Sequence, residues 1–467
     1  MKDASTQAKQ YGRQKIRLAV FQLLLTLLFL IVMLFSGTSV FLKQLVTRCT
    51  ENFYIQAALY LTLFSIIYYL LFVGLDFYGS FLLERKFSLS TQTITNWLKQ
   101  SIKKWLLSFV VFLVAAQALY FFLRHFPNNW PLPAAAAWLL FTIVLGRIAP
   151  VLIIPLFYKC SPLDNIVLKE RLLKLSSSCG LAVKQVFQIQ LSKETVKANA
   201  AVAGLGAGRR ILLADTLLEN FTDDQIEAIF AHELGHVRLH HGWKILSFTA
   251  VSSMTAFFLT NVLFKISSRI LGFSDVSDIA AFALLALILI LVGLLFVPVQ
   301  NAFLRYLEKQ ADIFALAHIT NTDSFTSAIT KLAHQNLSDP SPSKLVEILF
   351  HTHPPISERI KILRGMTHGA AFKDYSEAFA AVTHHKSVVP RTALTKEEIA
   401  LRESQAGEEK QERQQKQMRQ IGDIMRKVNQ FVFLTCVCGL KLKIPPNFKA
   451  DKVKCPRCGN HLDIPKK

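Results

Sequence analysis

Six apolar stretches set the main limit on what this 467-residue chain can fold into. Each is long enough to cross the roughly 30 Å hydrocarbon core of a bilayer as a helix. They are Leu18–Phe35, Phe53–Leu75, Trp105–Leu123, Ala134–Phe157, Lys244–Phe264 and Ile279–Leu304. We therefore expect a mainly α membrane protein with about six transmembrane helices.

The net charge of +21, from 53 basic and 32 acidic residues, has two explanations. The protein could bind nucleic acid, or its basic loops could face anionic lipid on the cytoplasmic side. The apolar stretches favour the second explanation and make nucleic acid an unlikely partner. Basic residues precede the first span and fill the loop between the second and third: Lys2, Lys9, Arg13, Lys15, Arg17, then Arg85, Lys86, Lys99, Lys103, Lys104.

This charge pattern predicts a cytoplasmic N-terminus, and four spans then return the chain to the cytoplasm at Tyr158. No A-x-A cleavage site follows the first apolar run, so we interpret it as a retained span. A signal peptide and an uncleaved anchor can nevertheless look alike.

The stretch Thr222–His241, TDDQIEAIFAHELGHVRLHH, contains a candidate metal site. On a helix, His232 and His236 lie within about 40° of each other, so both imidazoles can reach one tetrahedral ion. Glu233 projects beside that face, where a metal-bound water would lie. The alternative is a surface helix with two coincidental histidines. The following His240 and His241 are interpreted as the polar end of the helix.

Local signals support this helix and an α+β fold around it. Thr222 and Gln225 can form a capping box, and apolar residues follow at helical spacing. Upstream, the sequence predicts a helix over Val167–Leu175, a strand over Val186–Leu191 and a strand pair within Asn199–Leu213.

A third ligand is expected just past the last span. Asn301, Arg305, Glu308 and Asp312 form a polar stripe on the predicted helix. The hairpin of spans five and six returns the chain to the side of His232, so Glu308 can complete the site. Asp312 would then accept a hydrogen bond from a ligating imidazole, with Asn301 and Arg305 in the supporting shell. The alternative is an ordinary amphipathic helix with an Arg305–Glu308 ion pair.

These motifs, together with His353-Pro-Pro and Arg359, resemble the integral-membrane zinc metallopeptidases of the type I CAAX prenyl protease family. The similarity runs from Phe77 to Arg364 and includes Glu84-Arg-Lys-Phe87 with Gln92. It departs from the family at Ser88, where Gly is usual, and in having six spans where the eukaryotic enzymes have seven.

The resemblance implies a gluzincin-like catalytic domain, and the loop charges place it at the cytoplasmic face. The tail is not part of the familiar eukaryotic proteases, so we expect a bacterial relative in the inner membrane. The resemblance also implies a role for each matching residue: His232, His236 and Glu308 bind zinc, Glu233 is the general base, His353 and Arg359 stabilise the transition state, and Asn199, Ala200 and Ala201 pair with the substrate backbone.

The tail carries a second metal motif. Cys436, Cys438, Cys455 and Cys458 have the spacing of a zinc ribbon, which would close a structural zinc site with no open position. The alternative is a redox pair at Cys455 and Cys458. We expect this order of regions: 1–157 N-terminal membrane region, 158–243 catalytic domain, 244–304 transmembrane hairpin, 305–394 remainder of the catalytic domain, 395–430 charged linker, 431–467 ribbon.

The sequence thus predicts a membrane-embedded zinc metalloendopeptidase with one catalytic and one structural Zn²⁺. Its partners would be the lipid bilayer and a protein or peptide substrate, and nothing selects a partner for the ribbon. One alternative is a membrane-protein quality-control protease without prenyl specificity. Another, from a different class, is a non-catalytic membrane adaptor that acts through the ribbon.

Overall fold

The computed structural model describes residues 2–183, 185–203, 209–273, 275–319, 321–367, 432–444 and 450–464. The predicted linker over residues 395–430 lies outside these ranges. The chain divides into two compact units, Met1–Thr392 and Ala393–Lys467, which are described separately.

Six helices of the described chain are long and apolar enough to cross a membrane, as expected: Thr6–Phe35, Phe53–Lys86, Ile94–His125, Pro131–Phe157, His241–Ile270 and Ile279–His318. They carry large exposed apolar side chains, among them Leu24, Leu140, Val251 and Leu295, each more than half exposed. Apolar surface of this extent on helices of spanning length is suited to lipid contact.

The helical elements of the first four spans are α1 (Lys2–Phe35), α3 (Phe53–Phe77), α4 (Leu83–Lys86), α5 (Ile94–His125), α6 (Pro131–Ile148) and α7 (Ile154–Phe157). Single π-helical turns, Tyr78–Leu82 and Ala149–Ile153, join α3 to α4 and α6 to α7. The short helix α2 (Thr38–Thr47) has ten residues, about 15 Å, and is too short to span.

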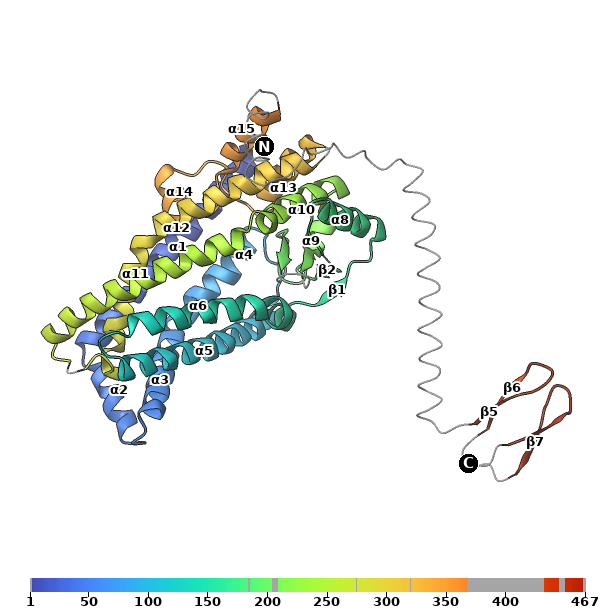
Figure 1. Ribbon diagram of the computed structural model, residues 1–467, viewed down its shortest axis with the longest axis horizontal. Helices are drawn as coiled ribbons and strands as arrows, with labels where there is room; N and C mark the ends of the chain where they lie inside the picture. Colours follow the sequence, from blue (N-terminus) through green and yellow to red (C-terminus); the bar gives the residue numbers. More distant parts are fainter. Residues whose placement is uncertain are drawn as a thin grey trace. The chain divides into compact units, whose positions relative to one another are not determined.

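The last two spans form the expected hairpin. Helix α11 (His241–Ile270) runs beside α12 (Phe282–His318), and a 3₁₀ turn at Ile279–Ala281 precedes α12 (Figure 1). Helix α12 is continuous over 37 residues although it contains Pro298. It therefore carries the chain from the span directly into the catalytic region.

The catalytic region contains a four-stranded sheet in the order β1-β2-β4-β3. Its strands are β1 (Cys160–Pro162), β2 (Gln185–Ile189), β3 (Ala200–Ala203) and β4 (Arg210–Ala214). β2 and β4 are parallel, whereas β1–β2 and β3–β4 are antiparallel, so the predicted strand pair is confirmed. β3 lies at the edge of the sheet.

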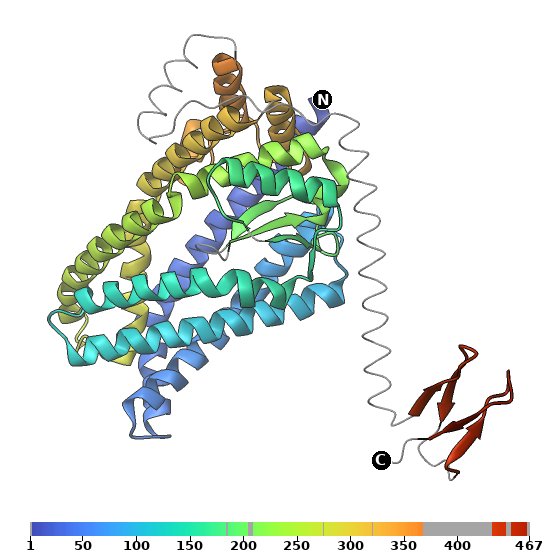
Figure 2. The same cartoon turned by 45° about the vertical axis from the view of Figure 1, so that its right-hand side comes forward.

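Helices α8 (Ile166–Ser178), α9 (Asp215–Asn220) and α10 (Asp223–Arg238) lie beside this sheet (Figure 2). Helix α13 (Thr322–Gln335) packs on α10, α14 (Lys344–Phe350) packs on α12, and α15 (Ile356–Thr367) packs on α12 and α13. Leu172 and Leu175 of α8, Ile211 of β4 and Leu234 of α10 share one buried core. Arg171 also joins α8 to α10 through an ion pair with Glu227. The motif helix is thus held on a rigid support.

The second unit contains two small hairpins. β5 (Val432–Thr435) pairs with β6 (Lys441–Ile444), and β7 (Lys452–Lys454) pairs with β8 (His461–Asp463), both antiparallel. Each hairpin is too short to bury a core of its own, so a cross-link is needed to hold the unit together.

Candidate active site

Helix α10 carries the central motif and begins as the sequence predicts. The Thr222 hydroxyl accepts from the backbone N–H of Gln225, and the Gln225 side chain accepts from the N–H of Thr222. This capping box satisfies two donors that the first helical turn cannot. His232 and His236 lie four residues apart on this helix, so both imidazoles project from the same face. His232 is buried and His236 is half-buried.

Three ligand groups meet at this face. His232 Nε2 lies 3.2 Å from His236 Nε2 and 3.3 Å from Glu308 Oε2 of α12, and His236 Nε2 lies 3.4 Å from Glu308 Oε1. Tetrahedral zinc with bonds of about 2.0–2.1 Å requires ligand atoms about 3.3 Å apart. Two imidazoles and one carboxylate are also ligands that catalytic zinc prefers. The cluster therefore fits a zinc ion.

The protonation of the two imidazoles also bears on metal binding. Burial and the neighbouring His232 lower the pKa of His236 to about 3, so its imidazole is neutral at neutral pH, the form that binds a metal. Burial alone would lower the pKa of His232, but the Asp312 and Glu308 carboxylates outweigh it and raise that pKa to about 9. Metal binding would therefore displace a proton from His232.

Helices α10 and α12 approach closely because Gly235 lacks a side chain. A Cβ at this position would lie 3.1 Å from Ala311 Cα and 3.2 Å from both the Ala311 carbonyl oxygen and Phe314 Cβ. Any larger residue would push α12 away. Gly235 thus sets the distance over which Glu308 reaches the two histidines.

Asp312, one turn beyond Glu308, lies beside His232. Its Oδ1 lies 2.8 Å from His232 Nδ1, the ring nitrogen that faces away from Glu308. Its carboxylate also accepts two hydrogen bonds from Arg359, at 2.8 Å from Nε and 2.5 Å from Nη2. All three side chains are buried, so the network fixes the orientation of the His232 ring. Arg359 acts on the site through Asp312.

Asn301 and Arg305 contact the backbone of α14 and of the following turn rather than the proposed metal ligands. Asn301 donates to the Ile348 carbonyl, and Arg305 Nη1 donates to the carbonyls of Glu347 and His351. They hold the end of α14 and the turn that presents His353. The His353 Nε2 lies 3.4 Å from Glu308 Oε1, and its side chain is largely exposed. His353 therefore reaches the ligand cluster from the solvent side.

His241 is a supporting residue that the sequence interpretation missed. It is buried, and its Nδ1 lies 3.0 Å from His236 Nδ1, while its Nε2 lies 3.2 Å from Gln310 Oε1. If His236 uses Nε2 for a metal, its Nδ1–H donates to His241, whose Nε2–H then donates to Gln310. His240, in contrast, is exposed and forms the turn into α11 with a φ of 56°.

Glu233 sits between the ligands and the sheet edge. Burial raises its pKa to about 7, the charge of His232 opposes this and the Glu308 carboxylate reinforces it. The nearby backbone of Val202 acts in the opposite direction and lowers this pKa. A carboxylate with a pKa near neutrality can both take up and release a proton at physiological pH.

The outer edge of β3 faces this glutamate. The Asn199 carbonyl accepts from Ala214 N, so the backbone groups of Asn199 and Ala201 point toward β4. Those of Ala200 and Val202 consequently point outward, which agrees with the Val202 contact to Glu233. Among the three residues expected to pair with substrate, only Ala200 has backbone groups that point to the open side. Val202, which was not among the three, has its backbone groups on that side as well.

A cavity of about 910 Å³ joins these parts. Its lining includes His232 and Glu233 of the motif, Asn199 at the start of the sheet edge, and His353 and Arg359. The N-terminal part of α1 forms another wall. The catalytic candidates thus share one space that can accept a polypeptide segment.

The four tail cysteines also converge. Cys436 Sγ lies 3.3 Å from Cys458 Sγ, and Cys438 Sγ lies 3.7 Å from Cys455 Sγ. Zinc–sulfur bonds of about 2.3 Å in a tetrahedron place the sulfurs about 3.8 Å apart. Because both hairpins contribute two cysteines each, the cluster fits a structural zinc that joins them.

Comparison with known sequences agrees with this geometry. Residues 162–367 match peptidase family M48, and residues 1–159 match the CAAX prenyl protease N-terminal region, described as five membrane helices. In this chain that region contains four candidate spans and the short helix α2.

Two relatives show how far the similarity extends. The chain is 30% identical to the uncharacterized metalloprotease YhfN of Bacillus subtilis over 361 residues, 76% of this chain and 84% of that protein. It is 28% identical to the probable CAAX prenyl protease 1 of Schizosaccharomyces pombe over 306 residues, 65% of this chain and 64% of that one.

The fold has a solved counterpart. The crystal structure of S. mikatae Ste24p superposes with a TM-score of 0.68, at 24% identity, and covers 78% of this chain and 89% of that one. Together with the YhfN similarity, the M48 match identifies the family. The chain belongs to peptidase family M48 and is an integral-membrane metalloendopeptidase.

Proposed function

We propose that the protein hydrolyses peptide bonds in membrane-associated polypeptides at a zinc site formed by His232, His236 and Glu308. The observation that carries this proposal is the convergence of the three ligand groups, of which His232 lines the same cavity as Glu233 and as Asn199 at the start of the sheet edge. Zinc held there supplies a Lewis acid that polarises the scissile carbonyl and acidifies water.

Residues of the chain bind the substrate, transfer the proton and stabilise the oxyanion. The substrate backbone pairs with the outward groups of Ala200 and Val202, which orients the scissile bond beside Glu233. Glu233 takes a proton from the attacking water and delivers it to the leaving amine. His353, on the open side, donates to the oxyanion that develops on the carbonyl. Arg359 and Asp312 keep His232 in its ligating orientation.

We place the site at the cytoplasmic face of a bacterial inner membrane, with both termini in the cytoplasm. The basic residues before the first span and between the second and third support this orientation. A second zinc, bound by the four tail cysteines, would stabilise the ribbon. Metal analysis of the purified chain should give about two zinc ions, and one after the four cysteines are replaced by serine.

For the biological role, we favour degradation of membrane proteins without prenyl specificity over processing of prenylated substrates. The bacterial metalloprotease that aligns over 84% of its length is not named for a prenylated substrate, whereas the prenyl protease of Schizosaccharomyces pombe is a eukaryotic protein. The adaptor hypothesis is set aside because the chain belongs to a peptidase family. Cleavage confined to prenylated peptides by the pure enzyme would refute the broader role.

The central test is Glu233→Gln in detergent-solubilised enzyme. The variant should retain the catalytic zinc but lose at least 10²-fold in kcat, since the base is gone while the three ligands remain. Glu219→Gln, at an exposed position on α9, is the matched control and should behave as wild type. Wild-type hydrolysis by Glu233→Gln would exclude Glu233 as the base.

A further inference from the structure

The N-terminal part of α1 presents two different faces to the catalytic region. Lys9, Gly12, Arg13 and Ile16 line the active-site cavity, and their spacing places them within about 100° of one another on the helix. Ala8 and Tyr11 pack in a small buried cluster with Phe87 and Leu89 of the loop after α4, and Tyr11 also reaches the cavity lining. The buried cluster therefore holds the helix in place beside the cavity.

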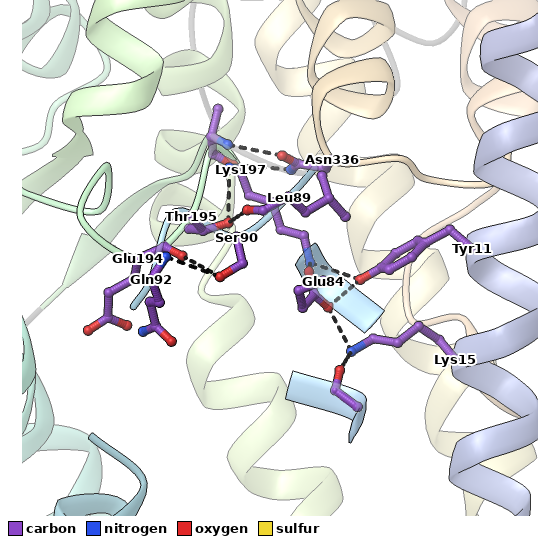
Figure 3. A network of polar contacts seen from close by, with 12 residues as sticks. Tyr11, Lys15, Glu84, Leu89, Ser90, Gln92, Glu194, Thr195, Lys197 and Asn336 are labelled. Carbon is purple, nitrogen blue, oxygen red and sulfur yellow. Dashed lines mark hydrogen bonds and ion pairs between the residues drawn. The ribbon is translucent and has the colours of Figure 1, made fainter. Parts of the chain in front are cut away.

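A polar network around Glu84 fixes this arrangement (Figure 3). The buried Glu84 carboxylate accepts from the Tyr11 hydroxyl at 2.6 Å and pairs with Lys15 at 2.8 Å and Lys197 at 2.7 Å. Lys197 also donates to the Tyr11 hydroxyl at 2.9 Å. Because Lys197 lies three residues before β3, Glu84 joins α1 directly to the segment that leads into the sheet edge.

The same segment is held from its other side (Figure 3). Asn336 accepts from the N–H of Ala198 at 3.0 Å and donates to its carbonyl at 3.1 Å. The Leu89 carbonyl accepts from Val196 N at 3.1 Å and from the Thr195 hydroxyl at 2.8 Å. The positions of α1 and of the sheet edge relative to each other are thus set by direct bonds.

Two cations on the cavity wall have no carboxylate partner. Lys15 and Lys197 share the single negative charge of Glu84, whereas no carboxylate of the described residues forms an ion pair with Lys9 or Arg13. Asp339 also lines the cavity, and its carboxylate accepts from the backbone N–H of Ser341. Lys9 is half-buried and Arg13 exposed, so both can meet a ligand that enters the cavity.

We propose that Lys9 and Arg13 select substrates that carry a carboxylate on the C-terminal side of the cleaved bond. This inference rests on the proposed peptidase function. Antiparallel strand pairs outnumber parallel ones, so we take the substrate strand to be antiparallel to β3. It then runs from Ala203 toward Asn199, with its scissile bond near Glu233 beside Val202. The residues after that bond therefore approach Ala198 and the wall formed by α1.

The bound carboxylate can belong to an acidic side chain or to the substrate C-terminus. A fluorogenic peptide cleaved by the wild-type enzyme would be made with Glu or Gln at the two positions after the cleaved bond. Each form would carry either a free or an amidated C-terminus. Measurements in an uncharged detergent at low ionic strength avoid competition from anionic lipid and screening by salt.

The variant Lys9→Gln/Arg13→Gln should lower the Glu-to-Gln ratio of kcat/KM, or the acid-to-amide ratio, roughly three- to tenfold. The ratio that falls identifies the source of the carboxylate. The reversal Lys9→Glu/Arg13→Glu should invert the preference. Arg17→Gln, an exposed cation on the same helix outside the cavity lining, should change neither ratio.

Two outcomes would overturn the inference. Both ratios could stay at the wild-type value in the double variant, or Arg17→Gln could lower them equally, which would indicate only the general positive charge of this face. The single variants at Lys9 and Arg13 give the same ratios if the double variant folds poorly. A failure of the proposed peptidase function can be distinguished from a failure of this inference. In that case the Glu233→Gln variant would cleave all four peptides.

Discussion

Gly235→Ala tests whether the crossing of α10 and α12 sets the metal geometry. The new Cβ would meet the Ala311 backbone and Phe314 Cβ at 3.1–3.2 Å, whereas carbon atoms prefer about 3.5–4.0 Å. The helices must therefore separate by about 0.5 Å. Overpacking of this kind costs about 1–3 kcal/mol, and the better helix propensity of alanine returns about 1 kcal/mol. The net loss of stability is then at most about 2 kcal/mol.

The metal site should suffer more than the fold. Glu308 lies one turn from Ala311 on α12, so a shift of about 0.5 Å moves its carboxylate away from both imidazoles. Metal–ligand distances tolerate only about 0.2 Å. We expect zinc affinity to fall at least tenfold while the melting temperature changes by a few degrees.

The assay is zinc titration against a competing chelator, in a chain whose four tail cysteines are serine so that one site is measured. Gly293→Ala is the control, because Gly293 lies on α12, the helix that carries Glu308, with no atom within 4 Å of its added Cβ. A wild-type zinc dissociation constant for Gly235→Ala would refute the role of the helix separation.

Three further predictions concern supporting residues. His241→Ala should weaken zinc binding roughly 10- to 100-fold, because it removes the hydrogen-bond acceptor for His236. His240→Asn, at an exposed position, should leave the zinc affinity unchanged. Equal zinc affinities of the two variants would show that His241 does not support the metal site. Asp312→Ala leaves Arg359 buried and unpaired, so it should cost about 3–5 kcal/mol of stability, and an unchanged melting temperature would contradict this. Ser88→Gly should stabilise by about 1 kcal/mol, since Ser88 is exposed with a φ of 56°, and a lower melting temperature would argue against strain there.

The periodic features were predictable from sequence for physical reasons. The six spans follow from apolar runs of bilayer length, and α10 follows from its capping box and stripe. Glu308 could be proposed because a two-span hairpin must return the chain to the same side. The sequence also marked Ser88 as a departure from the usual glycine of the family. The structure gives a physical reason for that glycine, because Ser88 has a φ of 56°, where glycine is favoured.

Contacts between distant elements could not be predicted. The role of His241 depends on a tight turn at His240 that folds α11 back against His236, and no periodicity signals that turn. Arg359 could be assigned to the site but not to its partner, because its pairing with Asp312 requires α15 to pack on α12. Similarly, Val202 was missed because the outward side of β3 depends on its register with β4.

Because α12 is continuous, a tilt of its membrane-spanning part also moves Glu308. Glu308 lies ten residues beyond Pro298, a distance of about 15 Å along the helix. A tilt of about 5° around that proline displaces the carboxylate by about 1.3 Å, several times what a zinc ligand tolerates. Spans respond to bilayer thickness by tilting. We therefore expect a change in the thickness of the surrounding membrane to shift the same carboxylate that the metal site uses.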